Sequence, residues 1–233
     1  MKQLLCALLF AVLSPAFAHA QDPLTAFPNN YKLILDTPDL RVIRCHYGPH
    51  EHVGVHNHSD YPTIYVYLSD SGPVRFTHDE TPPFVMTRPP VKTGAFRIAP
   101  GRPERHSVDN LGDLSSDYLR IELKKLPLHS LTSPKRDEAP ATLTQGNTEE
   151  FSDPDLTIHR IICSAGAPCP TGSPNLPTLL VAFSPAKIST ASTEKQMRSS
   201  DIQWLPNSQS LSIAASTPAP AHVLEIQFQE PKK

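Results

Sequence analysis

The chain has 233 residues and a formal net charge of -2, from 21 Lys and Arg against 23 Asp and Glu. With no basic excess and no Lys/Arg stripe, the composition argues against a partner such as nucleic acid or an anionic membrane. Proline, at 26 residues, is about twice as frequent as in an average protein. Because helical periodicity is almost absent, we expect an all-β chain with many short connections.

Residues 1–20 have the features of a secretory signal peptide. Lys2 provides the charged start, Leu4–Leu13 is the apolar run, and Ala18-His19-Ala20 is a small-x-small cleavage site, with Ala16-Phe17-Ala18 as a competing site. The apolar run is shorter than the roughly twenty residues needed to span a bilayer. No second long apolar segment follows, so we expect a soluble protein that is exported, either to a periplasm or outside the cell.

Three cysteines remain after the predicted signal. Cys163 and Cys169 flank the turn-forming sequence Ser-Ala-Gly-Ala-Pro, and export makes a disulfide between them one outcome. Cys45 lies in an apolar run, which favours a buried thiol. The absence of a C-x-x-C pair argues against a cysteine metal site.

Short alternating runs bounded by turn residues predict strands along the first half of the chain. The predicted strands are Tyr31–Asp36, Leu40–Tyr47, Thr63–Leu68, Val74–Thr77, Phe84–Thr87, Ala95–Ala99 and Asp117–Lys124. A histidine-rich loop is expected at Gly48–Gly54. Residues 126–148, rich in Pro, Ser and Thr, are expected to form a linker between a first domain at 21–125 and a second at 149–233.

The residues around Gly54–Asn110 suggest a metal site. Because side chains alternate along a strand, His56 and His58 should point the same way. His106 follows on another predicted strand. Three neutral imidazoles converging inside a barrel are a plausible site for a divalent ion.

The second half repeats the order of the first more faintly. Asp153–Leu156 matches Thr37–Leu40, and Leu176–Phe183 matches Tyr61–Leu68. This alignment places Thr171 and Ser173 opposite His56 and His58, and Ser212 opposite His106. We therefore expect the second unit to have no imidazole cluster and to serve a structural or partner-binding role.

These residues resemble the motifs of the cupin superfamily. His56-Asn-His58 matches the His-x-His of the first motif, and Gly94, Pro100, His106 and Asn110 match the second with one extra residue between the proline and the histidine. The resemblance implies two cupin-like β-barrels in tandem, the second degenerate. It further implies a small-molecule ligand and a divalent metal (Zn, Fe, Mn or Ni) held by His56, His58 and His106. A homodimer is a common cupin arrangement, although two barrels in one chain can satisfy that need internally.

Two departures from the family pattern affect the expected ligands. The family glutamate falls at Pro62 or Thr63, and Arg102-Pro103 replaces a motif glycine. Asp60, two residues beyond His58, is the candidate fourth ligand because an undistorted strand would carry it on the same face. His50 and His52 form a second His-x-His, which we interpret as a solvated surface pair.

The sequence supports two function hypotheses. One is a metal-dependent enzyme, a dioxygenase or an isomerase of a small molecule, with a tyrosine or arginine orienting the substrate; the other is a non-catalytic exported module that binds a small ligand or a metal. Tyr65, Tyr67, Arg97 and Arg105 are candidates to line a pocket, although packing or surface roles are more common for such residues. We expect structural or exposed positions for His46, His78, His129 and His159.

Overall fold

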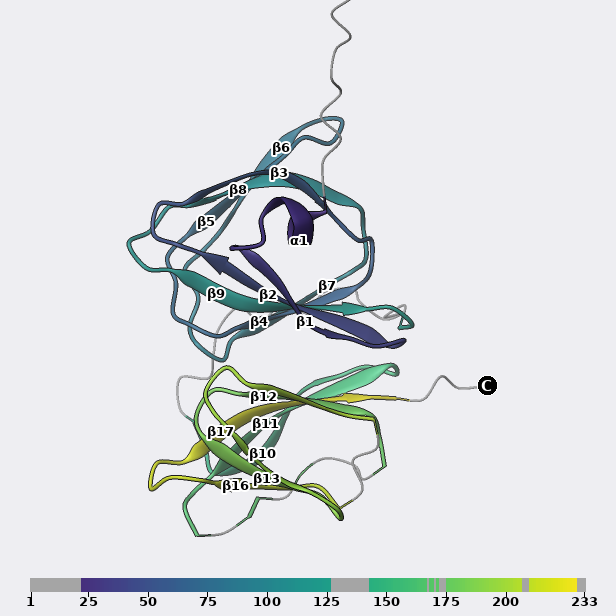
Figure 1. Cartoon of the computed structure of the whole chain (residues 1–233), viewed down its shortest axis with the longest axis vertical. Coiled ribbons are helices and arrows are strands. Elements are labelled where there is room, and N and C mark those ends of the chain that lie inside the picture. The colour runs from purple at the N-terminus through teal and green to yellow at the C-terminus, as the bar shows by residue number, and fades with distance from the viewer. Residues whose placement is uncertain are drawn as a thin grey trace, which may run out of the picture.

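The structure is a computed structural model that describes residues 22–126, 143–166, 168–169, 171, 175–206 and 210–229. The predicted signal peptide, His129 and most of the predicted linker lie outside these residues. In the described part, the chain forms two antiparallel β-barrels stacked one on the other (Figure 1). The predicted all-β class with two tandem barrels is confirmed.

The first barrel closes two sheets over a common interior. One sheet has the order β1-β2-β9-β4-β7, and the other has the order β3-β8-β5-β6. Its elements are α1 (Pro23–Ala26), β1 (Tyr31–Asp36), β2 (Leu40–Tyr47), β3 (His52–His58), β4 (Thr63–Tyr67), β5 (Val74–His78), β6 (Phe84–Arg88), β7 (Phe96–Ala99), β8 (Glu104–Asn110) and β9 (Ser116–Leu123).

The second barrel repeats this topology. Its larger sheet has the order β10-β11-β17-β12-β15, and its smaller sheet has the order β14-β13-β16. The first strand pair of each barrel carries a register shift at the same place, between Leu33 and Leu35 and between Glu149 and Phe151. The strands are β10 (Gly146–Ser152), β11 (Leu156–Cys163), β12 (Thr178–Ala182), β13 (Ala186–Ser189), β14 (Glu194–Met197), β15 (Ile202–Leu205), β16 (Ser212–Ala215) and β17 (Ala221–Phe228).

The two larger sheets pack face to face and share one hydrophobic core. Strand β9 shows why, because Leu119, Ile121 and Leu123 face the second barrel while Tyr118 and Arg120 face the interior of the first. The shared core joins such residues of β9, β4 and β2 to their counterparts on β11, β12 and β17. Each large sheet is therefore buried on both faces, and the barrels do not have fully separate cores.

A polar contact crosses the same junction. Arg160 of β11 donates to the carbonyl oxygen of Gly94 at 2.8 Å, and it also donates to Nε2 of His222 at 2.7 Å. Gly94 has a φ of +84°, and a Cβ there would lie 3.0 Å from His222 and 3.1 Å from Arg160. Only glycine therefore fits this position without strain.

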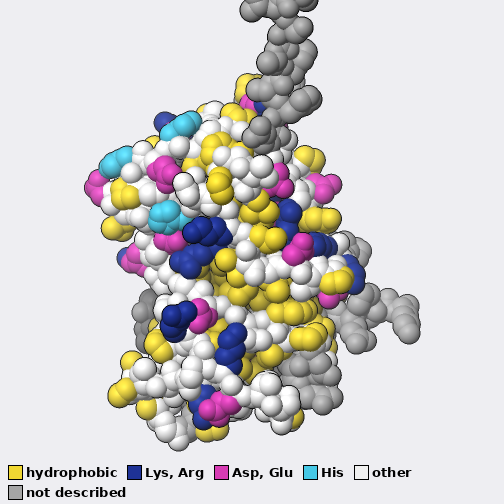
Figure 2. All heavy atoms as spheres, viewed as in Figure 1, with side chains coloured by type: hydrophobic (Ala, Val, Ile, Leu, Met, Phe, Trp, Pro, Cys, Tyr) yellow, Lys and Arg dark blue, Asp and Glu magenta, His cyan; other side chains and the backbone are white. Residues whose placement is uncertain are grey.

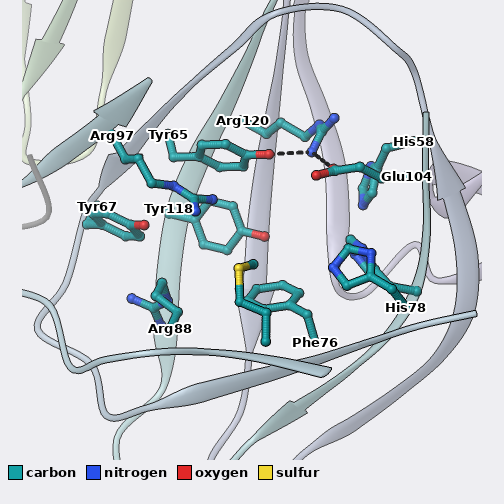
Figure 3. Close-up of a pocket in the computed structure, with 12 residues that line it drawn as sticks. His58, Tyr65, Tyr67, Phe76, His78, Arg88, Arg97, Glu104, Tyr118 and Arg120 are labelled. Carbon is teal, nitrogen blue, oxygen red and sulfur yellow. Dashed lines mark hydrogen bonds and ion pairs between the residues drawn. The ribbon is translucent and has the colours of Figure 1, made fainter. Parts of the chain in front are cut away.

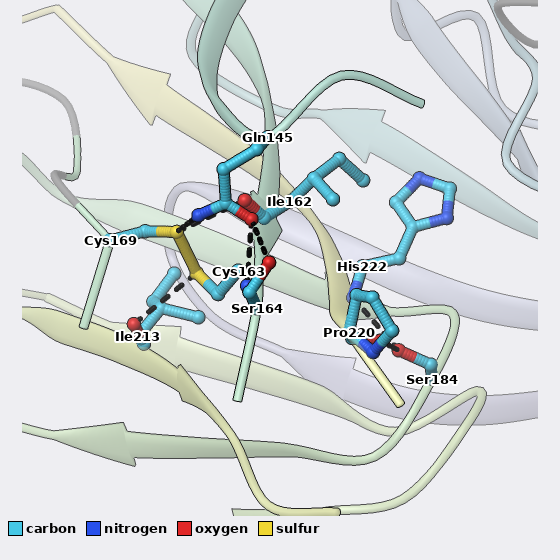
Figure 4. The surroundings of a disulfide bond; sticks show 9 residues. All are labelled: Gln145, Ile162, Cys163, Ser164, Cys169, Ser184, Ile213, Pro220 and His222. Atoms are coloured by element: carbon cyan, nitrogen blue, oxygen red, sulfur yellow. Dashed lines mark hydrogen bonds between the residues drawn. A yellow bond between two sulfur atoms is a disulfide. The ribbon is translucent and has the colours of Figure 1, made fainter. Parts of the chain in front are cut away.

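The disulfide between Cys163 and Cys169 is present in the structure and ties the end of β11 to the following loop (Figure 4). The backbone N–H of Cys169 donates to Ile213 O at 2.8 Å, which adds this loop to the edge of β16. Gln145 accepts hydrogen bonds from the backbone and hydroxyl of Ser164 beside it. Cys45 is a free, fully buried thiol as expected, and burial raises its pKa to about 12.

Three sequence expectations are corrected by the strand boundaries. β3 begins at His52, inside the stretch expected to be a loop, because it pairs with β8 from that residue onward. β10 begins at Gly146, inside the range expected to be a linker. The two barrels can be aligned through equivalent strand pairs, since Val74 pairs with Asn110 in the first and Ala186 pairs with Ala215 in the second. His106 lies four residues before Asn110, and the residue four before Ala215 is Leu211. The second-barrel counterpart of His106 is therefore Leu211 rather than Ser212.

The protonation state of His222 at this junction should affect how the stability of the protein depends on pH. Burial, reinforced by Arg160, lowers the pKa of His222 to about 3, so this side chain stays neutral in the folded protein. An unfolded histidine titrates near 6.5. Between these two values the unfolded state binds a proton that the folded state does not, so stability falls as the pH falls below about 6.5.

We expect His222→Gln to remove this pH-dependent contribution to stability, because glutamine does not titrate. Its side-chain oxygen can still accept a hydrogen bond from Arg160. Urea unfolding measured from pH 7.5 to 4.5 should show a stability difference between parent and variant that shrinks by up to about 1.4 kcal/mol per pH unit below pH 6. Parallel curves for the two proteins would contradict the assignment of a neutral, buried His222.

Candidate metal centre and pocket

Two neighbouring strands bring the three predicted histidines together. His56 and His106 are directly opposed on β3 and β8, and His58 lies two residues along β3 on the same face. The nearest ligand nitrogens of His56, His58 and His106 all lie within 4.8 Å of one another. His56 and His106 are buried and His58 is partly buried. Strand alternation together with the motif spacing therefore predicted the grouping of these side chains.

The hydrogen bonds of His56 determine its tautomer. Its Nδ1 lies 2.8 Å from the carbonyl oxygen of Gly54, which can only accept, so Nδ1 carries the proton. The lone pair is then on Nε2, which accepts from the hydroxyl of Tyr31 at 2.8 Å and lies 3.1 Å from Nε2 of His58. The backbone thus orients His56 as a ligand through Nε2.

The other two rings carry buried nitrogens with no hydrogen-bond partner among the described residues. These are Nδ1 of His58 and both ring nitrogens of His106. Burial, the neighbouring imidazoles and Arg120 lower the pKa of His106 to about 2, and burial followed by Arg120 holds the pKa of His58 well below its usual range. The rings are therefore neutral, which is the form that binds metals, and a bound ion would satisfy buried nitrogens that now lack partners. The residues fit a divalent metal.

Asp60 does not join the histidines, which corrects its assignment as the fourth ligand. β3 ends at His58, so the alternation that would carry Asp60 inward stops there. The loop then packs against Gly101, where a Cβ would lie 2.2 Å from the Asp60 carbonyl oxygen, and the Asp60 side chain is exposed.

The carboxylate that does face the interior is Glu104, two residues before His106 on β8. It lines the same pocket as His58 and accepts from Nη1 of Arg120 at 2.8 Å. Its spacing from His106 is the signal that sequence reasoning missed. Arg120 also donates to Tyr65 at 2.8 Å, so a single buried guanidinium holds two pocket groups (Figure 3). It donates as well to the buried Glu122, at 2.9 Å.

A pocket opens beside the histidines inside the first barrel. The cavity that the side chains leave is about 20 Å³, and the space counted out to the open mouth, solvent included, is about 410 Å³. Figure 3 shows His58 and His78 at one end, with Arg88 and Arg97 at the other. The lining residues are His58, Tyr65, Tyr67, Phe76, His78, Met86, Arg88, Arg97, Glu104, His106, Tyr118 and Arg120.

Arg88 brings a buried positive charge into this pocket. Only 5% of the residue is exposed, and its Nη2 donates to the hydroxyls of Ser71 and Ser116 at 3.0 and 3.1 Å. Its Nη1 is buried without a hydrogen bond, and no carboxylate lies within ion-pair distance of it among the described residues. A buried cation without a counter-charge is costly, so this end of the pocket favours an anion.

Three buried tyrosines connect the histidines to the pocket. The hydroxyl of Tyr31 lies 2.8 Å from that of Tyr47, which lies 2.7 Å from that of Tyr118. Because Tyr31 donates to His56, it must accept from Tyr47, and Tyr47 must accept from Tyr118. The chain of hydroxyls therefore has one direction, from the pocket toward His56.

The remaining sequence candidates divide between interior and surface. Tyr65, Tyr67 and Arg97 line the pocket, whereas Arg105 is exposed and pairs with Asp79 at 2.6 Å. His78, expected to be structural or exposed, is a buried pocket residue stacked on Phe84, with ring centroids 4.2 Å apart. Its position opposite His106 on β5 explains this placement.

His50 and His52 are exposed and contact Asp113 and Asp109, which agrees with a surface pair. In the view of Figure 2 the exposed histidine side chains lie on the first barrel.

The interior of the second barrel is mostly apolar, with the buried Glu225 at the position that Arg120 has in the first. Thr171 and Leu211 face each other where His56 and His106 stand in the first barrel, and Thr171 donates to the Leu211 carbonyl oxygen at 3.2 Å. Leu180 and Val223 take the places of Tyr65 and Tyr118. The described residues of this barrel therefore provide no histidine cluster.

Comparison with known proteins supports the fold. No protein-family model and no curated protein matches the chain. Among solved structures, AerE from Microcystis aeruginosa has a TM-score of 0.58 at 12% identity, covering 86% of this chain and 98% of its own. A variant of oxalate decarboxylase OxdC from Bacillus subtilis has a TM-score of 0.56 at 13% identity, covering 87% of this chain and 73% of its own. A variant of salicylate 1,2-dioxygenase from Pseudoaminobacter salicylatoxidans has a TM-score of 0.55 at 13% identity, covering 82% and 71%.

Among the residues that the structure describes, no helix has the length and apolar character of a membrane span.

The comparisons agree with the topology of the chain. The matches cover more than four-fifths of it, and the strand order is shared by both barrels, in agreement with the motifs around His56 and His106. The chain therefore has the cupin fold, in the two-barrel form of the bicupins.

Proposed function

We propose that this protein is a metal-dependent enzyme that acts on a small organic carboxylate inside its first barrel, with dioxygenation or isomerisation as the reaction class. One observation carries the proposal. Three neutral histidines that can hold a metal lie at one end of a pocket whose other end presents the unpaired guanidinium of Arg88. A ligand with a carboxylate and a reactive centre would satisfy both ends.

His56, His58 and His106 would hold the ion, and Fe, Zn, Mn and Ni are all compatible with imidazole ligands. A bound ion supplies Lewis acidity and an open position for substrate or a small co-substrate. Oxalate decarboxylase from Bacillus subtilis, which shares the fold, has Mn(II) centres, and this supports a metal in a barrel of this kind.

The protein's own side chains would bind and orient the substrate. Arg88 would donate Nη1 to a carboxylate, and Arg97 adds positive charge to the same end. Tyr118 keeps lone pairs toward the pocket because its proton is donated to Tyr47, so it can accept a proton or hydrogen bond from the substrate. The substrates named for two solved neighbours, oxalate and salicylate, are also carboxylates, which supports this class.

Export is part of the proposal. The N-terminal segment has a signal-like sequence, and the disulfide between Cys163 and Cys169 supports an oxidising compartment. We place the enzyme in a periplasm or outside the cell.

One observation favours a non-catalytic binding module as the second candidate. The histidine cluster includes no carboxylate among the described residues, and Glu104 is engaged by Arg120. A protein that binds carboxylates and metal without converting any substrate would fit this alternative, so turnover of metal-loaded protein with a carboxylate panel decides between the two.

The metal site can be tested by elemental analysis of the mature protein, purified without a histidine tag. We expect close to one equivalent of Fe, Mn, Ni or Zn in the parent and none in His56→Ala/His106→Ala, because that variant keeps one imidazole of three. At a free metal concentration a hundred times its Kd, the ion should also stabilise the parent by about 2.7 kcal/mol.

The double variant His50→Ala/His52→Ala is the matched control, since it removes two exposed histidines outside the pocket. It should keep the metal content of the parent. Loss of metal in this control, or a parent that binds none after incubation with each ion, would contradict the assignment.

The anion site can be tested with matched neutral and charged ligands. We expect Arg88→Met to weaken binding of benzoate and similar carboxylates at least about tenfold, while benzamide binding is unchanged, because a charge-assisted hydrogen bond contributes about 1.5–3 kcal/mol. Isothermal titration calorimetry measures both. Arg75→Met, at an exposed arginine paired with Asp109, is the control and should bind as the parent does. Equal losses for benzoate and benzamide would show a packing role for Arg88 instead.

A further inference from the structure

Tyr31 places a hydroxyl group beside the histidine cluster. It is the first residue of β1, it is 1% exposed, and its ring centroid lies 4.9 Å from that of His56 and 5.6 Å from that of His58. Its hydroxyl lies 2.8 Å from Nε2 of His56, the nitrogen left free for a metal. A phenol oxygen thus lies beside the nitrogen that would bind the ion, on a strand well before the motifs that hold the histidines.

The separations around His56 match those of ligands that share one ion. Nitrogen and oxygen ligands lie roughly 2.0–2.2 Å from ions such as Zn²⁺. At angles between octahedral and tetrahedral, two such ligands are therefore about 2.8–3.6 Å apart. Nε2 of His58 lies 3.1 Å from Nε2 of His56, and the Tyr31 oxygen lies 2.8 Å from it. Both atoms are placed like neighbouring ligands of a common metal.

We infer that Tyr31 is the fourth protein ligand of this centre, bound as a phenolate in the role that a carboxylate would otherwise have. This inference rests on the proposed metal site. Coordination releases the phenolic proton to bulk water and forms one metal–oxygen bond, while the hydrogen bond from Tyr31 to His56 is lost. No electron is transferred in this step.

The surroundings of Tyr31 suit a phenolate once a cation is present. Tyr47 already donates to the Tyr31 oxygen and Tyr118 donates to Tyr47, so the chain of hydroxyls keeps its direction when Tyr31 loses its proton. A divalent ion in contact with the Tyr31 oxygen would favour the phenolate over the phenol. Three neutral imidazoles leave the charge of a divalent ion uncompensated, and a negative phenolate ligand reduces that charge.

The experiment uses iron as an optical probe. The mature protein is loaded with Fe(II) without oxygen and then oxidised in air, because phenolate bound to Fe(III) gives a visible charge-transfer band that imidazole ligands do not give. We expect the band in the parent and in Tyr47→Phe, and its absence in Tyr31→Phe. Tyr47→Phe is the matched control, since it removes a buried hydroxyl of the same chain that is one step from the ion.

Zn²⁺ affinity provides a second readout that needs no iron chemistry. In competition with a chromophoric chelator, we expect Tyr31→Phe to bind Zn²⁺ at least tenfold more weakly than the parent. Tyr47→Phe should lose less affinity than Tyr31→Phe, because it keeps the ligand oxygen and removes only a hydrogen bond to it. Circular dichroism checks the fold of each variant. If Tyr31→Phe fails to fold, the parent decides alone, because a colourless ferric parent overturns the inference.

The outcomes separate this inference from the metal site itself. A parent that binds iron and zinc without a charge-transfer band, and with an affinity unchanged in Tyr31→Phe, means a three-histidine centre without a tyrosine ligand. A parent that binds neither ion overturns the metal site and this inference together.

Discussion

The structure depends on two five-stranded sheets that are buried on both faces. In β9, one set of alternate residues packs against the second barrel and the other set lines the first interior. Apolar side chains occupy the outer face of that sheet, so the inner face is free to carry polar groups without losing the stability of the sheet. The second barrel thereby acts as the hydrophobic support on which a polar first interior can be built.

The two interiors have diverged on the same framework. Tyrosine, histidine and arginine fill the first, where each buried polar group needs a partner, and Arg120 supplies several of those partners at once. Mostly apolar residues fill the second, with Glu225 as a buried charged exception. The same strand order can therefore hold a reactive pocket in one copy and a simple packed core in the other.

Local periodicity accounts for the part of the site that could be predicted from the sequence. His56, His58 and His106 lie on strands, and alternation together with the motif spacing was enough to bring them together. Asp60 was predicted wrongly because the same alternation was extended past the end of β3. The inward position of Glu104 obeys the same rule on β8, but the family motif places its carboxylate elsewhere, at Pro62 or Thr63.

Other site residues depend on tertiary packing that no local pattern records. Tyr31 reaches His56 only because β1 folds across the end of the barrel, and Arg88 enters the pocket only because β6 pairs with β5. His78 became a pocket residue through its register with His106. Sequence reasoning could name these residue types but had no means to place them.

The contact between Arg160 and the Gly94 carbonyl has a consequence for cooperativity. Gly94 lies just before β7, the strand that carries Arg97 into the pocket, and its backbone is held by a side chain of the other barrel. Separation of the barrels would expose the apolar residues of the shared core. It would also break the hydrogen bond from Arg160 to Gly94 and so free the backbone next to the pocket. The two barrels therefore constitute a single thermodynamic unit, in which the half without a histidine cluster contributes to the preorganisation of the half that has one.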